Sequence, residues 1–170
     1  MVTEKIVKLA SPADTVRLQR LLERCSDYYE LHEGCATPTD AGDYELNSIP
    51  PGLTQDGLWL FALQDNNNGT LHAAVQVLRN YPERGSWWIG LLVVAPVLRG
   101  SGIGSTLLRH VIDAAAADGA TAIRLAVSVK NPRAASFWEA AGFRHTGQTQ
   151  NATARGGHVD TVRMMARAIK

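Results

Sequence analysis

The most informative segment of the chain is Leu91-Leu92-Val93-Val94-Ala95-Pro96-Val97-Leu98-Arg99-Gly100-Ser101-Gly102-Ile103-Gly104-Ser105. Its apolar start predicts a buried strand that breaks at the proline, and three glycines then lead into a helix over about 102–117. Glycines let the backbone approach a ligand closely, and a helix start offers unpaired N–H groups at the positive end of a dipole. Arg99 adds a cation suited to a phosphate. The segment therefore predicts an anion site.

A glycine-rich turn alone is also compatible with a plain strand-to-helix connection, and neither common nucleotide fingerprint fits this spacing. However, Arg99-x-x-Gly102-x-Gly104 after a V-x-P strand resembles the acyl-CoA pyrophosphate motif of the GNAT superfamily of N-acetyltransferases. A second segment, Asn131-Pro132-Arg133-Ala134-Ala135-Ser136-Phe137-Trp138-Glu139-Ala140-Ala141-Gly142-Phe143, resembles the superfamily's N-x-x-A…(Y/W)-E-x-x-G-F block. The two motifs together indicate this superfamily more specifically than either motif alone.

The apolar patterning predicts an α+β (mixed α/β) fold, which the resemblance also implies: a single GNAT-like domain over residues 1–170. We expect helices on both faces of a mixed, mostly antiparallel sheet of about seven strands: 5–9, 58–63, 71–78, 87–94, 122–129, 143–150 and 158–167. The expected helices are 11–25, capped by Ser11, then 40–48, 102–117 and 132–141, with 26–38 less regular. Strands 87–94 and 122–129 should be parallel because a helical crossover joins them.

The composition is that of an ordinary globular protein. The chain has 170 residues, of which 45% are hydrophobic and 19% charged, with a net charge of +1. No basic excess indicates a nucleic-acid partner, no apolar run predicts a membrane span, and no signal-peptide core precedes the first strand, so we expect a cytoplasmic protein. Cys25 and Cys35 are expected to be free thiols, and no metal site is predicted.

The resemblance implies acetyl-CoA as the cofactor and places it on named residues. The pantetheine arm would lie between the two parallel strands, on the backbone of Leu92 and Val94. The pyrophosphate would lie on Arg99, Gly100, Ser101, Gly102, Ile103, Gly104 and Ser105. The arm would also contact Asn131, Ala134 and Phe137. The alternatives are core packing for the apolar side chains and a helix cap for Asn131.

The acid and base common in the superfamily are absent. Trp138 stands where many members carry a tyrosine, and Trp88 where many carry a glutamate. An indole N–H does not titrate, so neither tryptophan is assigned a catalytic role and the catalytic residues stay unassigned. Deprotonating an alkylammonium of pKa about 10.4 at pH 7 costs about 4–5 kcal/mol, so some group or water should take that proton.

Residues 23–56 hold half of the chain's acids, eight of 16, and three of its four tyrosines. Carboxylates beside aromatic rings suit a cationic ligand. In the resembling superfamily this region forms the substrate wall. The expected substrate residues are Asp27, Tyr28, Glu30, Glu33, Asp40 and Tyr44. The alternative interpretation is a solvated helical face with core tyrosines.

Together these features predict an acetyl-CoA-dependent N-acetyltransferase that moves the acetyl group directly to the amine of a small cationic molecule. The candidates include an aminosugar or aminoglycoside-like antibiotic, which would imply antibiotic resistance. Other acceptors, a polyamine, an amino acid or a protein amine, stay open, as does a homodimer. From a different class, a catalytically degenerate acyl-CoA sensor or interaction module also fits the cofactor motifs.

Overall fold

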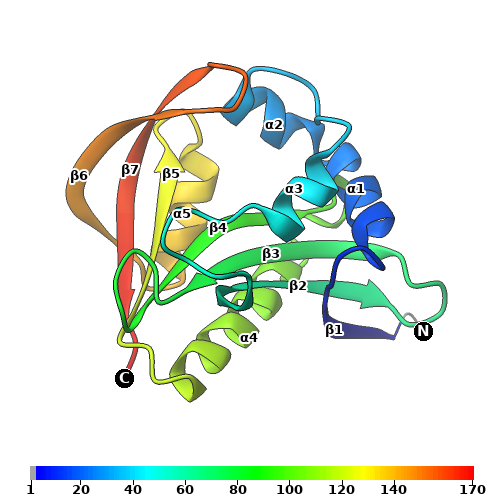
Figure 1. The fold of residues 1–170 in the computed structure, drawn as a ribbon, viewed down its shortest axis with the longest axis horizontal. Helices are drawn as coiled ribbons and strands as arrows, with labels where there is room; N and C mark the ends of the chain where they lie inside the picture. The colour runs from blue at the N-terminus through cyan, green and yellow to red at the C-terminus, as the bar shows by residue number, and fades with distance from the viewer. Residues whose placement is uncertain (1–2) are drawn as a thin grey trace.

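Seven strands form one continuous sheet in the order β1-β2-β3-β4-β5-β7-β6 (Figure 1). This computed structural model describes residues 3–170. The strands are β1 Glu4–Lys8, β2 Leu58–Asp65, β3 Leu71–Arg79, β4 Ser86–Val94, β5 Ala122–Ser128, β6 Arg144–Thr153 and β7 Val159–Ala168. The helices are α1 Thr15–Arg24, α2 Ser26–Glu33, α3 Ala41–Asn47, α4 Ile103–Ala117 and α5 Pro132–Ala140, with short 3-10 turns at Gln55–Gly57 and Pro96–Leu98.

The helices lie on both faces of the sheet, and each face has its own core. Helices α1, α2 and α3 cover one face, and α4 lies on the other (Figure 1). Leu18, Leu21 and Leu46 pack with Leu91 on the first face. On the second face, the α4 side chains pack against Trp87 and the aromatic residues of α5. The predicted mixed α/β fold is confirmed.

The sheet is antiparallel except where β4 meets β5, as predicted. That parallel pairing runs only from Ser86–Ala122 to Ile89–Leu125, although both strands continue. Gly90 is an extra residue in β4, since Gln76 of β3 faces Leu91 while the next residue of β3 faces Ile89. A bulge bends the strand that carries it, so β4 leaves β5 at this position.

Two local expectations at the N-terminal half were wrong. Ser11 does not cap the first helix, because residues 11–14 form a turn and α1 begins after Asp14, whose carboxylate accepts the Ala10 N–H at 2.8 Å. The segment expected to be less regular contains helix α2, which ends at Gly34 in the left-handed conformation. Glycine adopts that conformation without a steric penalty, so the end of α2 could be read from the sequence.

Within residues 3–170, no helix is long and apolar enough to cross a membrane. In the same range, no three His, Cys, Asp or Glu side chains are grouped so that they could hold a metal ion.

The contact between α1 and α3 predicts a stability effect. A Cβ on Gly42 would lie 2.6 Å from the Thr15 carbonyl oxygen and 2.9 Å from the Gln19 nitrogen, both backbone atoms. We expect Gly42→Ala to lower the free energy of unfolding by about 1–3 kcal/mol, because overpacking forces the helices apart. Urea unfolding measures this. Gly156→Ala, where a Cβ meets nothing within 4 Å, is the control, and equal stability of both variants would contradict the close packing.

Candidate functional site

A cavity of about 630 Å³ opens where β4 and β5 separate. Most of the expected cofactor residues line it: Leu92, Val94, Arg99, Gly100, Gly102, Gly104, Ser105, Asn131, Ala134 and Phe137. Ser101 and Ile103 lie in the same turn but do not line the cavity. Of the expected substrate residues, Asp27 and Tyr28 line the cavity, and the other four do not. The structure thus brings the two motifs to one place.

The turn into α4 has the geometry that an anion needs. Gly100 and Gly102 have φ angles of 80° and 89°, and a Cβ on either would meet nothing within 4 Å. No side chain caps α4, so the first N–H groups of this helix have no side-chain acceptor. Ser101 cannot act as that cap because its hydroxyl donates to the Leu98 carbonyl. Unpaired N–H groups beside open backbone are suited to a diphosphate, so the residues fit the pyrophosphate of acetyl-CoA.

Arg99 is already engaged by an acid on α2. Its guanidinium donates two hydrogen bonds to the Asp27 carboxylate, with Nη2 2.9 Å from Oδ1, and its Nε donates to the Val94 carbonyl at 3.0 Å. The ion pair holds the pKa of Asp27 below its usual range and raises that of Arg99. Asp27, expected to bind the substrate, therefore contacts Arg99 in the glycine turn, where the cofactor is expected.

The second motif forms α5 and the far wall of the cavity. The Asn131 side chain accepts the Ala134 N–H at 3.0 Å, so it caps α5, as the alternative interpretation held. Its amide N–H groups remain to serve a ligand. Trp138 is buried and packs edge-on against Phe137 and Phe143, at 4.9 and 5.3 Å between ring centroids. These contacts account for Trp138 as a packing residue.

The expected acidic wall is divided by its ion pairs. Glu30 is exposed and accepts a hydrogen bond from Ser26. Asp40 pairs through both oxygens with Arg155, at 3.1 and 3.3 Å, from the turn between β6 and β7. The same guanidinium lies 3.8 Å from the centre of the Tyr44 ring. Charges that are compensated within the chain attract a ligand less, so these residues are weaker candidates than the sequence suggested.

Glu45 was not among the residues expected from the sequence, and it is less exposed than Glu30 and Asp40. Gln76 donates to its Oε2 at 3.1 Å and to its backbone oxygen at 2.9 Å. Burial raises the pKa of Glu45 to about 7, and Glu33 adds to the rise. The available signal was Gln76 itself, a lone amide in the apolar run of β3.

Helix α2 is also fastened at its other end. His32 Nδ1 lies 3.3 Å from Asp160 Oδ2 on β7, and the Ser128 hydroxyl at the end of β5 donates to Asp160 Oδ1 at 2.9 Å. Burial, the largest cause, lowers the pKa of His32, although Asp160 opposes this. Between the two anchors, Tyr28 faces the cavity.

The sequence model of the acetyltransferase (GNAT) family matches residues 18–143, more than half of the chain. The chain belongs to the GNAT family. The family transfers acetyl groups from acetyl-CoA, so acetyl-CoA is the cofactor that the motifs predicted. The family assignment made from the two motifs is confirmed.

Solved structures with the same fold include GNAT enzymes of different specificity. The chain is 18% identical to the ribosomal-protein-S18-alanine N-acetyltransferase of Escherichia coli, with a TM-score of 0.73, covering 99% of this chain and 95% of that one. It is 20% identical to the spermidine N-acetyltransferase of Vibrio cholerae, solved with CoA and spermine, with a TM-score of 0.73 and coverages of 98% and 95%. An acetyltransferase of Thermus thermophilus is 23% identical, with a TM-score of 0.73 and 99% coverage of both chains. At these identities the likeness establishes the fold.

The turn predicts that charge at Gly104 blocks acetyl-CoA. A Cβ there would lie 3.5 Å from Phe137 and Val94, an ordinary contact, and an acid at a helix start favours the helix. Gly104→Asp should therefore fold normally but bind acetyl-CoA at least about 100-fold more weakly, because like charges repel. Calorimetry measures this, with Gly104→Ala as the control for volume. Unchanged affinity of Gly104→Asp would remove the pyrophosphate from this turn.

The ion pair between Asp27 and Arg99 predicts a variant that binds acetyl-CoA more tightly. Asp27→Asn removes an anion from the edge of the expected cofactor site and releases the guanidinium for phosphate. We expect acetyl-CoA to bind about two- to fivefold more tightly at low salt, the magnitude of a partly exposed ion pair. The gain should shrink as salt rises. Weaker binding at all salt concentrations would mean that Asp27 mainly holds Arg99 in its binding position.

Proposed function

We propose that this GNAT protein transfers acetyl directly to the amine of a small cationic molecule. The observation that carries the proposal is the shared cavity, in which the glycine turn and Tyr28 of α2 face one space. Burial, the largest cause, raises the pKa of Tyr28, and the negative charges of Glu45, Glu33 and Asp160 add to the rise. An ammonium group beside Tyr28 would meet aromatic surface and negative potential together.

The chain's residues divide the work of such a transfer. The uncapped start of α4 and the glycine turn bind the diphosphate, and the free edge of β4 beyond Ile89 is available to the amides of the pantetheine arm. Acetyl-CoA, when bound, supplies the thioester. Trp138 and Phe137 exclude water from the same wall.

Direct transfer is supported by the state of the two thiols. Cys25 is fully buried, and burial raises the pKa of its thiol. Cys35 is exposed and does not line the cavity. A nucleophilic cysteine needs a lowered pKa and access to its substrate, and neither residue combines the two.

The acceptor class rests on charge. A polyamine agrees with the acids around Tyr28 and with the spermine bound to the Vibrio cholerae relative. An aminosugar or aminoglycoside-like antibiotic satisfies the same charges, and an amino acid or protein amine remains as the alternative that the Escherichia coli relative's substrate exemplifies. A cytoplasmic location, a homodimer and a role in antibiotic resistance stay predictions from the sequence.

The test is a thiol-release assay with acetyl-CoA and a panel of amines. We expect polyamines and aminosugars to be acetylated and neutral or anionic amino acids to react at least about tenfold more slowly, because each desolvated charge pair contributes 1–3 kcal/mol or so. Initial rates should show a ternary complex, with no acetylated protein in the absence of acceptor. Binding of acetyl-CoA without turnover of any amine would favour the sensor, and faster reaction of anionic acceptors would refute the charge argument.

A further inference from the structure

Glu45 lies over the point where β4 and β5 separate. Gln76 lies opposite Leu91 in the sheet, and its side chain crosses β4 so closely that a Cβ on Gly90 would lie 2.3 Å from its Oε1. The same amide donates to Glu45 Oε2 at 3.1 Å. The carboxyl is therefore held above Gly90, one residue beyond the last pair of β4 with β5, and two residues before Leu92 lines the cavity.

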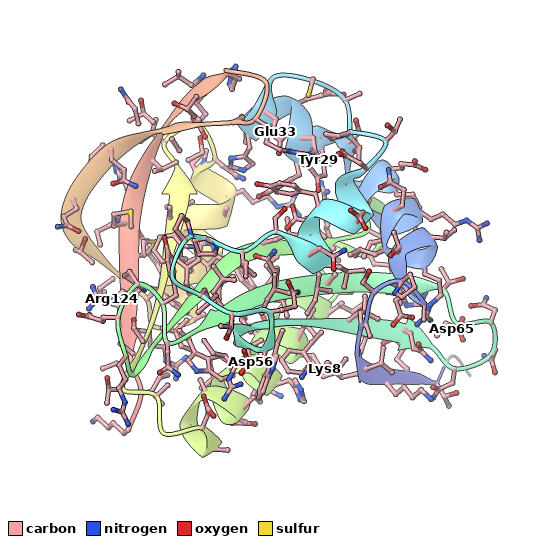
Figure 2. The ribbon with its side chains drawn as sticks, viewed as in Figure 1. Lys8, Tyr29, Glu33, Asp56, Asp65 and Arg124 are labelled. Carbon is pink, nitrogen blue, oxygen red and sulfur yellow. The ribbon has the colours of Figure 1, made fainter. Side chains whose placement is uncertain are left out.

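The groups that face Glu45 come from two elements and a turn. Tyr29 and Glu33 lie on α2, beside α3 (Figure 2), Arg155 lies in the turn between β6 and β7, and Gln76 lies on β3. The Tyr29 hydroxyl is buried and has no hydrogen-bond partner at ordinary geometry within residues 3–170, yet it is close enough to favour the ionised carboxylate. An unpartnered buried hydroxyl beside a carboxyl is a polar site that a bound group could complete.

These neighbours set the base strength of the carboxyl. Burial is the largest cause of the pKa of about 7, and the negative charge of Glu33 adds to it, whereas Arg155 and Tyr29 oppose it. Relative to an ordinary glutamate, the carboxylate is about 300-fold more basic, at tenfold per pKa unit. It is still ionised in a large fraction of molecules at neutral pH, which a general base requires.

We propose that Glu45 is the catalytic base, taking the proton of the acceptor ammonium at the point where β4 leaves β5. This inference rests on the proposed function. An N–H bond of the ammonium breaks and an O–H bond forms at Glu45, directly or through one water. The freed nitrogen pair then forms the C–N bond to the acetyl carbon while the C–S bond breaks. The second nitrogen proton goes to the departing sulfur, and Glu45 returns its proton to solvent, so that amide, thiol and one proton are the products.

Gln76 and Glu33 are positioning residues for this step. The amide N–H on Oε2 holds the carboxyl over β4 and leaves Oε1 without a bond to Gln76. Glu33 keeps the pKa of Glu45 raised by like charge, and together the two carboxylates attract the ammonium that is to be deprotonated.

The test is the pH profile of kcat/KM for an acceptor from the panel with a pKa near 10. In the wild type the rate should rise as Glu45 ionises, level off above a pH of about 7, and stay level up to the acceptor's pKa. In Glu45→Gln the neutral amine must be supplied by solution, so the rate should rise about tenfold per pH unit towards pH 10. The deficit should be about 100-fold at pH 7 and should shrink steadily as pH rises.

Three measurements separate this role from a structural one. Affinity for acetyl-CoA should be unchanged in Glu45→Gln. Its melting temperature at pH 8 should not fall, because a carboxyl whose folded pKa is raised destabilises the fold when ionised. Glu23→Gln, an exposed acid on α1, is the matched control and should retain the wild-type profile. A Glu45→Gln profile that levels off at the wild-type pH would overturn the proposal.

A second variant keeps Glu45 in place. Glu33→Gln removes the neighbouring negative charge, so the wild-type rise should move to lower pH while the plateau remains. An unmoved rise would assign the titration to another group and overturn the role of Glu45, even if amines are acetylated. Failure of the wild type to acetylate any amine would instead overturn the proposed function.

Discussion

β4 and β5 are hydrogen-bonded only from Ser86 to Ile89 on one strand and from Ala122 to Leu125 on the other. The position of the cavity depends on this short pairing. The bulge at Gly90 bends β4 away, and the Gln76 side chain occupies the space that a Cβ would need there. The cavity opens directly beyond, so the backbone edge of β4 is available to a ligand. A cofactor can lie between the strands only because the sheet itself is interrupted.

Helix α2 joins the two halves of this site. At its start Asp27 holds Arg99 of the glycine turn, and at its end His32 contacts the buried Asp160 of β7. Tyr28 faces the cavity between the two. The helix therefore fixes Tyr28 relative to the glycine turn, and a change at one of the two contacts should also alter the other.

Most of the fold could be predicted from the sequence because strands and glycine turns depend on residues that are close together in the chain. The run 91–105 and the block 131–143 identified the family, and both line the cavity. Partners distant in the chain could not be predicted. From the sequence the charge of Asp27 looked available to a ligand, but the structure pairs it with Arg99, which lies 72 residues further along the chain.

The acidic residues of 23–56 show the same limit. The acids and aromatic rings of 23–56 favoured Asp40 and Tyr44 as substrate residues. In the structure Arg155, in the turn between β6 and β7, forms an ion pair with Asp40 and lies over the Tyr44 ring. Glu45 is adjacent to Tyr44, yet it turns inward because Gln76 offers an amide in an otherwise apolar strand. Composition located the acidic region. Only the contacts made across the sheet distinguish an acid that is paired with a cation, such as Asp40, from one with a raised pKa, such as Glu45.

Backbone amide hydrogen exchange with and without acetyl-CoA tests whether the cofactor lies between the separated strands. We expect slower exchange at residues 100–105 and at Leu92 and Val94, where the turn and the free edge of β4 would contact the cofactor. A separate groove between α1 and the start of α3 is lined by Val16, Gln19 and Asp43, and exchange there should not change. Protection confined to that groove, with residues 100–105 unaffected, would contradict a cofactor site at the interruption of the sheet.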